Sequence, residues 1–91
     1  MLAIDDTVQR NQRMPWRIIE DEAILVNIEN EIVIHLNEVA AVIWGAMDGK
    51  RTVREIVDTV HSMFKADRAT IEKDVVRFIE ELLEKDAATV L

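Results

Sequence analysis

The sequence predicts a small α+β domain of winged-helix type, in which a three-stranded antiparallel sheet is followed by three helices. Three observations support this fold class. Short runs of Ile, Leu and Val between Arg17 and Leu36 are separated by acidic residues, as is typical of strands joined by turns. After Leu36, residues suited to cap helices precede apolar patterns with a helical period. A chain of 91 residues that is 49% hydrophobic is also the size of one such domain.

Residues 1–15 are expected to form a flexible N-terminal arm, and residues 16–91 the folded domain. The first segment is mostly polar, carries Arg10 and Arg13, has no sustained hydrophobic period and ends at Pro15. We therefore expect no packed element there, and we place the start of the fold at Trp16.

Three strands are expected from the runs RII, AILVNI and IVIHL, with turns at residues 20–22 and 29–31. A two-residue second turn would pair Ile24 with His35 and mix apolar with polar residues. A three-residue turn pairs Ile24 with Leu36 and gathers aliphatic residues on one face. We therefore predict the three-residue turn, with Asn30 in a left-handed conformation. The second face is then mixed and holds Leu25, Asn27, Val33 and His35.

Each of the three helices has a recognisable first residue. Asn37 is a good N-cap for the first helix, and Asp48-Gly49 provides its stop signal, with Gly49 in the C′ position. The run from Thr52 to Glu55 has capping-box spacing and predicts the start of the second helix. Asp67 is expected to cap a third helix that runs to about residue 85, and ATVL predicts a short final strand.

The third helix has more apolar surface than packing on one neighbour requires. One stripe of the predicted helix holds Ile71, Val75, Phe78 and Leu82, and the apolar arc is extended by Val76, Ile79 and Leu83. The extended part needs a cover, which the sheet edge, the arm, another subunit or a ligand would provide.

Composition argues against several classes of function. There is no cysteine, and no signal peptide or membrane-spanning stretch is recognisable, so we expect a cytoplasmic protein. His35 and His61 lie on different predicted elements without metal-ligand spacing. The acidic turns are better explained as solvated turns than as a cation site. We therefore predict no enzyme activity, no catalytic residue, no metal and no cofactor.

Binding to nucleic acid is the alternative function, because winged-helix folds often bind DNA. Arg51, Arg54, Lys65 and Arg68 could form a basic rim near the second helix. Acidic residues are interleaved with them, however, and the net charge of −7 repels phosphates. A peptide or protein partner is the preferred prediction.

The apolar strand from Ile32 to Leu36 indicates how a peptide would bind. If this strand lies at a sheet edge, its free backbone groups can pair with an added strand, and the apolar arc of the third helix can receive that strand's side chains. The competing explanation is that these residues are ordinary core. It is the stronger explanation for Ile32, Ile34, Val75, Phe78 and Leu82 taken one by one.

The chain resembles the PqqD-like family, the peptide-recognition modules of pathways that modify ribosomally made peptides. The resemblance covers about residues 16–91 and rests on the order and spacing of several short motifs. These are Leu36-Asn37, Ala40 or Ala41, Ile43-Trp44, Asp48-Gly49, the run from Thr52 to Val57, and the run from Asp74 to Ile79 followed by Leu82-Leu83.

This resemblance implies a module without chemistry of its own, which binds the leader segment of a precursor peptide and presents it to a modifying enzyme such as a radical S-adenosylmethionine protein. The leader would add as a strand to the third strand, beside the third helix. Carried onto this chain, the implied peptide-binding residues are Ile32, Val33, Ile34, His35 and Leu36 on the strand, and Val75, Val76, Ile79 and Leu83 on the helix.

The pathway and the oligomeric state stay open at this point. Members that serve pyrroloquinoline quinone often have a Tyr-Pro-Glu-Gly-like turn before the third strand, where this chain has Ile28-Glu29-Asn30-Glu31. The peptide could therefore be that precursor, a lasso peptide or another modified peptide. A homodimer whose groove is filled by its own partner is a further alternative.

Overall fold

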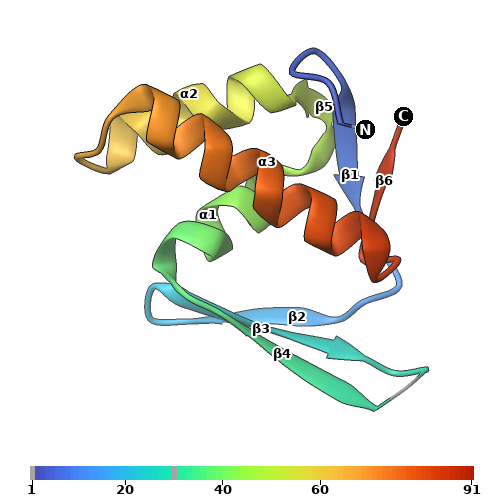
Figure 1. The fold of residues 1–91 in the computed structure, drawn as a ribbon. Helices are drawn as coiled ribbons and strands as arrows, with labels where there is room; N and C mark the ends of the chain where they lie inside the picture. The colour runs from blue at the N-terminus through green and yellow to red at the C-terminus, as the bar shows by residue number, and fades with distance from the viewer. Residues whose placement is uncertain (1, 30) are drawn as a thin grey trace.

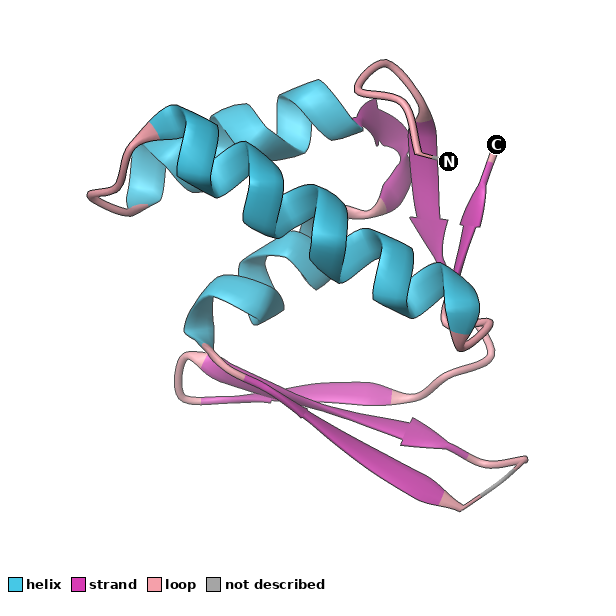
Figure 2. Cartoon of the chain, viewed as in Figure 1, coloured by secondary structure: helices cyan, strands magenta, loops and turns pink. Residues whose placement is uncertain are grey.

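A computed structural model describes residues 2–29 and 31–91 of the chain. Within these residues, three helices and two small sheets form the fold (Figure 1; Figure 2). In chain order the elements are β1 (Thr7–Arg10), β2 (Trp16–Ile19), β3 (Glu22–Asn27), β4 (Ile32–Leu36), α1 (Glu38–Ala46), β5 (Asp48–Thr52), α2 (Val53–Met63), α3 (Arg68–Glu84) and β6 (Ala88–Val90). The α+β prediction is confirmed.

The predicted antiparallel sheet is present, in the order β2-β3-β4, but its predicted register is wrong by one residue. Ile24 pairs with His35, and Ala23 pairs with Leu36. The physical reason is the buried face: Leu25 and Leu36 both enter the core, at 0% and 3% exposure, and only the observed register puts them on one face. Glu31 has the positive φ of 59° in this turn, whereas Asn30, where we expected it, lies outside the described residues.

Residues 2–15 do not form an unpacked arm. Strand β1 lies in the middle of a second antiparallel sheet, in the order β5-β1-β6, and Val8 is fully buried. The predicted final strand is present as β6, but β1 and β5 were not predicted. Their sequences, TVQR and DGKRT, are polar and lack an aliphatic strand pattern, because one side chain of β1 and none of β5 is buried.

The predicted helix starts are confirmed. The side chain of Asn37 accepts a hydrogen bond from the Ala40 N–H at 2.9 Å, Thr52 forms a reciprocal capping box with Glu55, and the Asp67 carboxylate accepts from the Thr70 N–H. The end of α1 differs in detail. Met47 is the C-terminal cap, so the expected C′ position of Gly49 is wrong; Gly49 instead lies within β5 with φ of +79°.

Helix α1 lies between the other helices and the β2-β3-β4 sheet (Figure 1). Its Trp44 is fully buried. Arg10, at the end of β1, donates hydrogen bonds to the carbonyl oxygens of Gly45 at 3.2 Å and Met47 at 3.3 Å, at the C-terminal end of α1. A cation is favourable there because the last carbonyls of a helix carry partial negative charge. Arg10 therefore links the N-terminal strand to the helix that supports the sheet.

Candidate peptide-binding site

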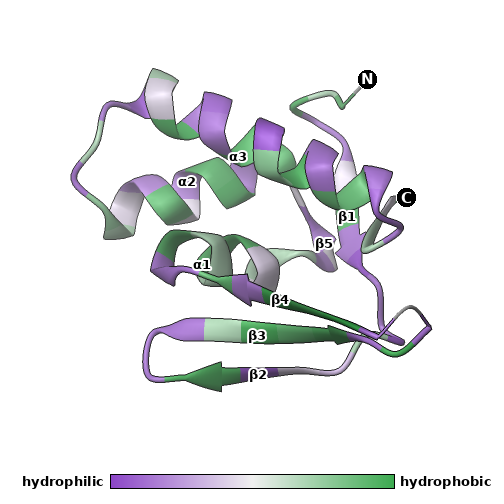
Figure 3. Cartoon of the chain, turned by 60° about the horizontal axis from the view of Figure 1, so that its bottom comes forward, coloured by the Kyte–Doolittle hydropathy of each residue, from purple (hydrophilic) through white to green (hydrophobic). Residues whose placement is uncertain are grey.

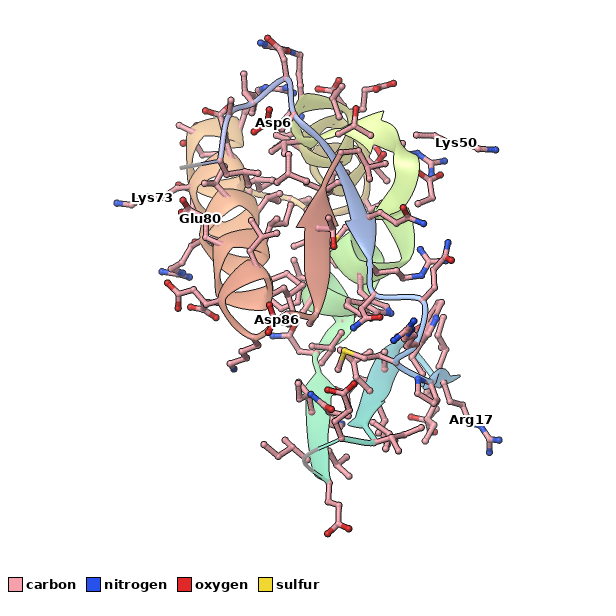
Figure 4. All side chains as sticks on the ribbon, turned by 90° about the vertical axis from the view of Figure 1, so that its right-hand side faces the viewer. Asp6, Arg17, Lys50, Lys73, Glu80 and Asp86 are labelled. Carbon is pink, nitrogen blue, oxygen red and sulfur yellow. The ribbon has the colours of Figure 1, made fainter. Side chains whose placement is uncertain are left out.

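Strand β4 is an edge of its sheet. Within the described part of the chain it pairs with β3 alone, so one side of its backbone has no strand beside it. In Figures 1 and 4, α3 and β4 lie on the same side of the molecule, with the helix above the strand. The predicted arrangement of an open edge below the third helix is therefore present.

The hydrogen bonding of β3 determines which β4 groups point outward. In an antiparallel pair, a residue directs both its N–H and its C=O to the same neighbour, and successive residues alternate between the two sides. The N–H of Val26 donates to the Pro15 carbonyl at 2.9 Å, on the β2 side. Leu25 and Asn27, on either side of Val26, therefore direct their groups to β4.

It follows that Leu25 forms a hydrogen-bonded pair with Ile34, and Asn27 with Ile32. The N–H and C=O groups of the alternate residues, Val33 and His35, then point away from the sheet. These four backbone groups are the ones that a guest strand can use.

The β4 side chains divide between the two faces of the sheet. Ile34 is partly buried and Leu36 is almost fully buried, so Leu36 serves the core rather than a peptide. On the opposite face, Val33 is 64% exposed and His35 is exposed. Ile32 lies near the end of the hairpin and is 50% exposed. Figure 3, which brings this sheet forward, shows β4 as largely hydrophobic in spite of this exposure.

The helix residues expected to form the groove wall are placed differently. Val75 and Ile79 are fully buried in the core. Val76 and Leu83 are partly buried on another flank of α3, and Leu83 shares a shallow hollow with Leu2 and Val90, on the β6 side of the helix. Helical periodicity alone could not assign the flanks, because it does not say on which side β6 packs.

The flank of α3 nearer the sheet is identified by Lys85. This residue follows the last turn of α3 and lines a hollow with Asn27 and Ile28, at the end of β3. Phe78 is seven residues earlier, on the same face of the helix, and is partly buried. Phe78 is therefore the large apolar side chain on the flank nearer the sheet. It was expected to be core and does pack partly against it, but its position at one edge of the apolar stripe was a usable signal.

Charged groups near the edge are solvated. His35 Nε2 lies 3.1 Å from Glu22 Oε1 across the outer face of the sheet, and both side chains are at least half exposed. Exposed pairs of this kind contribute little to stability. They do add a polar patch at the end of an otherwise apolar edge.

The proposed basic rim for nucleic acid is largely neutralised by carboxylates. Arg51 pairs with Asp48 at 2.7 Å, Arg54 with Asp5 at 3.1 Å, and Arg68 with Asp58. The hydrogen bond that Arg54 donates to the Asp5 carboxylate raises the pKa of Arg54. Cations that are already paired within the chain release less free energy on binding phosphate, so this surface does not favour duplex DNA.

Residues 2–29 and 31–91 show neither a metal centre nor a membrane-spanning helix. No group of three or more His, Cys, Asp or Glu side chains in these ranges could hold a metal ion. None of the helices described there is both long and apolar enough to cross a bilayer.

Comparison with solved structures finds a protein of the same fold. The structure described as "TbiB1 in Complex with the TbiA(beta) Leader Peptide" superimposes with a TM-score of 0.79 and 25% sequence identity. The match covers 88% of this chain and 93% of that chain.

Comparison with protein families and individual relatives gives a consistent result. The family model described as Coenzyme PQQ synthesis protein D (PqqD) matches residues 22–87. A PqqA binding protein of Rhodopseudomonas palustris (strain TIE-1) is 33% identical over 88 residues, covering 97% of this chain and 72% of the relative. A PqqA binding protein of Pseudomonas syringae pv. syringae (strain B728a) is 41% identical over 56 residues, covering 62% and 58%. The chain belongs to the PqqD family.

Proposed function

We propose that this chain binds the leader segment of a ribosomally made precursor peptide by adding it as a strand to β4. The observation that carries the proposal is the open edge, where the N–H and C=O groups of Val33 and His35 point away from the sheet. The likeness to a leader-peptide complex and to PqqA binding proteins supports the same class of ligand.

The peptide-binding surface that we propose has two parts. The backbone edge comprises Ile32, Val33, Ile34 and His35, and the side-chain contact on the helix is made by Phe78. Backbone pairing supplies affinity for many extended peptides. Ile34 and Phe78 provide specificity, because they favour apolar side chains at alternate positions of the guest strand. Leu36, Val75 and Ile79 support this surface from the core.

In this proposal the chain performs no chemistry and acts as an adaptor in the cytoplasm. It holds the leader while a separate modifying enzyme, for example a radical S-adenosylmethionine protein, acts on the rest of the precursor. Strand addition suits this task, because it fixes the leader by its backbone and leaves the remainder of the peptide free. The precursor of pyrroloquinoline quinone, a lasso peptide and another modified peptide all fit the site.

The test is an NMR titration of the ¹⁵N-labelled protein with a synthetic leader peptide of the precursor encoded beside this chain. We expect the amides of residues 32–36 and of the second half of α3 to shift, with slowed hydrogen exchange at Val33 and His35. A titration that leaves these amides unmoved at high micromolar peptide would refute the proposal. Light scattering of the free protein provides the second measurement. A dimer that dissociates when leader is added would mean that leader and the second copy compete for the same β4 edge, which supports the proposal. A dimer that does not respond to leader contradicts it.

A further inference from the structure

The β2-β3-β4 sheet has a second open edge, at β2. In the described residues β2 pairs only with β3. The alternation that points Val33 outward on β4 also applies here, because the Val26 N–H bonds to Pro15 and Ile24 pairs with Arg17. The N–H and C=O groups of Trp16 and Ile18 therefore point away from β3, toward solvent.

This edge is unusually apolar for a surface strand. Ile18 and Ile19 are 56% and 51% exposed on opposite faces of β2. A shallow hollow at this edge is lined by Ile19 together with Pro15, Trp16, Arg17, Ile24 and Val26. Proteins usually protect an edge strand with charges or a covering loop, and an exposed aliphatic edge indicates a site where another strand binds.

The charge along this edge changes from basic to acidic, because β2 follows an arginine-containing segment and is followed by the acidic turn of residues 20–22. The net charge is −7, yet residues 7–19 contain three arginines and no carboxylate. Arg10 lies 5.1 Å from the centre of the Trp16 ring. Arg17 extends into solvent on the β2 side of the molecule (Figure 4), and no carboxylate lies within ion-pair distance of it among the described residues.

These charges argue against a second copy of β2 as the occupant. Two β2 edges in antiparallel pairing would bring Arg17 of one copy close to Arg17 of the other, and like charges on neighbouring strands are destabilising. A strand with a carboxylate opposite Arg17 would instead meet a guanidinium group that has no ion-pair partner among the described residues.

We propose that β2 is a second docking edge, which binds an extended aliphatic segment with carboxylates, presented by a partner protein. This inference rests on the proposed function, because the leader occupies β4 and leaves β2 as the free edge of the same sheet. The natural occupant is then the protein that acts on the bound precursor. Leader and partner would extend one sheet from its two sides, with β2, β3 and β4 between them.

The test uses two short capped probe peptides, one alternating Glu and Val and the other alternating Lys and Val, in ¹⁵N NMR titrations of the full chain. We expect the acidic peptide to shift Trp16, Arg17 and Ile18 and the basic peptide to leave them unmoved. Shifts confined to β4, or equal shifts with both peptides, would overturn the proposal.

Two variants make the test specific. Ile18→Pro removes an outward N–H without removing a hydrogen bond to β3. The sheet should therefore stay folded, while binding of the acidic peptide is lost. Arg17→Glu should lower the affinity for the acidic peptide by about tenfold or more, through like-charge repulsion. Acidic-peptide binding that both variants leave unchanged would refute docking at β2.

Leader binding is measured on the same Ile18→Pro protein. If the leader still shifts β4 while the acidic peptide no longer shifts β2, the two edges act independently, as we propose. If the leader does not bind the unmodified protein but the acidic peptide binds β2, the proposed function is wrong. The docking edge then stands as a separate property.

Discussion

The indole rings of Trp16 and Trp44 meet edge to face, with centroids 6.3 Å apart and ring planes at 79°. Trp16 is the first residue of β2, and Trp44 is buried in α1. The pair therefore joins the start of the β2-β3-β4 sheet to the helical core, while Arg10 lies over the Trp16 ring. Together with the packing of α1 on β3 and β4, this contact holds the sheet against the helices.

Replacing Trp16 with Ala should destabilise the fold. The variant loses the edge-to-face contact and its cation partner, and we expect the free energy of unfolding to fall by about 1–3 kcal/mol. Urea denaturation followed by circular dichroism measures the change. Trp16→Phe retains an aromatic edge and should cost less than Trp16→Ala. Equal stability of all three proteins would show that the sheet is held by other contacts.

Two proline variants test the orientation of the β4 backbone. Val33→Pro removes an outward N–H, so the fold should remain and leader affinity should fall by about tenfold. Ile34→Pro removes a hydrogen bond to β3 and should lower the free energy of unfolding by about 1–3 kcal/mol. Calorimetric titration with leader peptide and urea denaturation separate the two effects. If Val33→Pro were the less stable variant, the assigned alternation would be reversed.

Two truncations on α3 distinguish the flanks of the helix. Phe78→Ala should weaken leader binding by about tenfold, because it removes the large apolar side chain nearer the sheet. Leu83→Ala, on the β6 flank, should leave leader affinity within about twofold of the unmodified protein. Fluorescence anisotropy with a labelled leader measures both. The reverse order of effects would place the peptide on the β6 side of α3.

Asp48 should make the fold sensitive to acid. Its carboxylate accepts hydrogen bonds from the N–H groups of Lys50 at 2.9 Å and Arg51 at 3.1 Å, and these bonds, the one from Lys50 most of all, lower its pKa below the ordinary value of 3.8. A folded-state pKa below the unfolded one means that ionised Asp48 stabilises the fold above that ordinary value. This stability is lost as the pH falls through the folded pKa.

The matched variant for this prediction is Asp48→Asn. It should be less stable than the unmodified protein at pH 7, and the gap should close between about pH 5 and pH 2, as Asp48 becomes protonated. Urea denaturation at a series of pH values measures the gap. A gap that stays constant with pH would mean that the carboxylate charge has no part in stability.

Local features of the fold could be predicted from the sequence. Asn37, Thr52 and Asp67 cap helices within a few residues of themselves, so no distant information was needed to place the helix starts. The β1 and β5 strands could not be predicted, because they are polar and pair over about forty residues of sequence. The register of β4 was also missed, since it depends on which strand face meets α1 rather than on the matching of aliphatic residues.

The candidate site was predicted in part for the same reason. The open edge at Ile32 to His35 follows from a hairpin whose last strand is followed directly by a helix, and this order is visible in the sequence. The wall of the groove depends on how α3 is rotated about its axis. That rotation is set by the contacts of α3 with α2 and β6, which the helical pattern of α3 does not contain.

The open β4 edge also has a consequence for the solution behaviour of the protein. An aliphatic edge strand with free backbone groups can pair with the same edge of another copy, which is a common route to aggregation. A net charge of −7 opposes that pairing by repulsion between copies. The repulsion disappears near the isoelectric point of about 4.7, so concentrated protein should be most prone to self-association at mildly acidic pH. The acidic composition that repels nucleic acid thus also opposes pairing between the β4 edges of two copies.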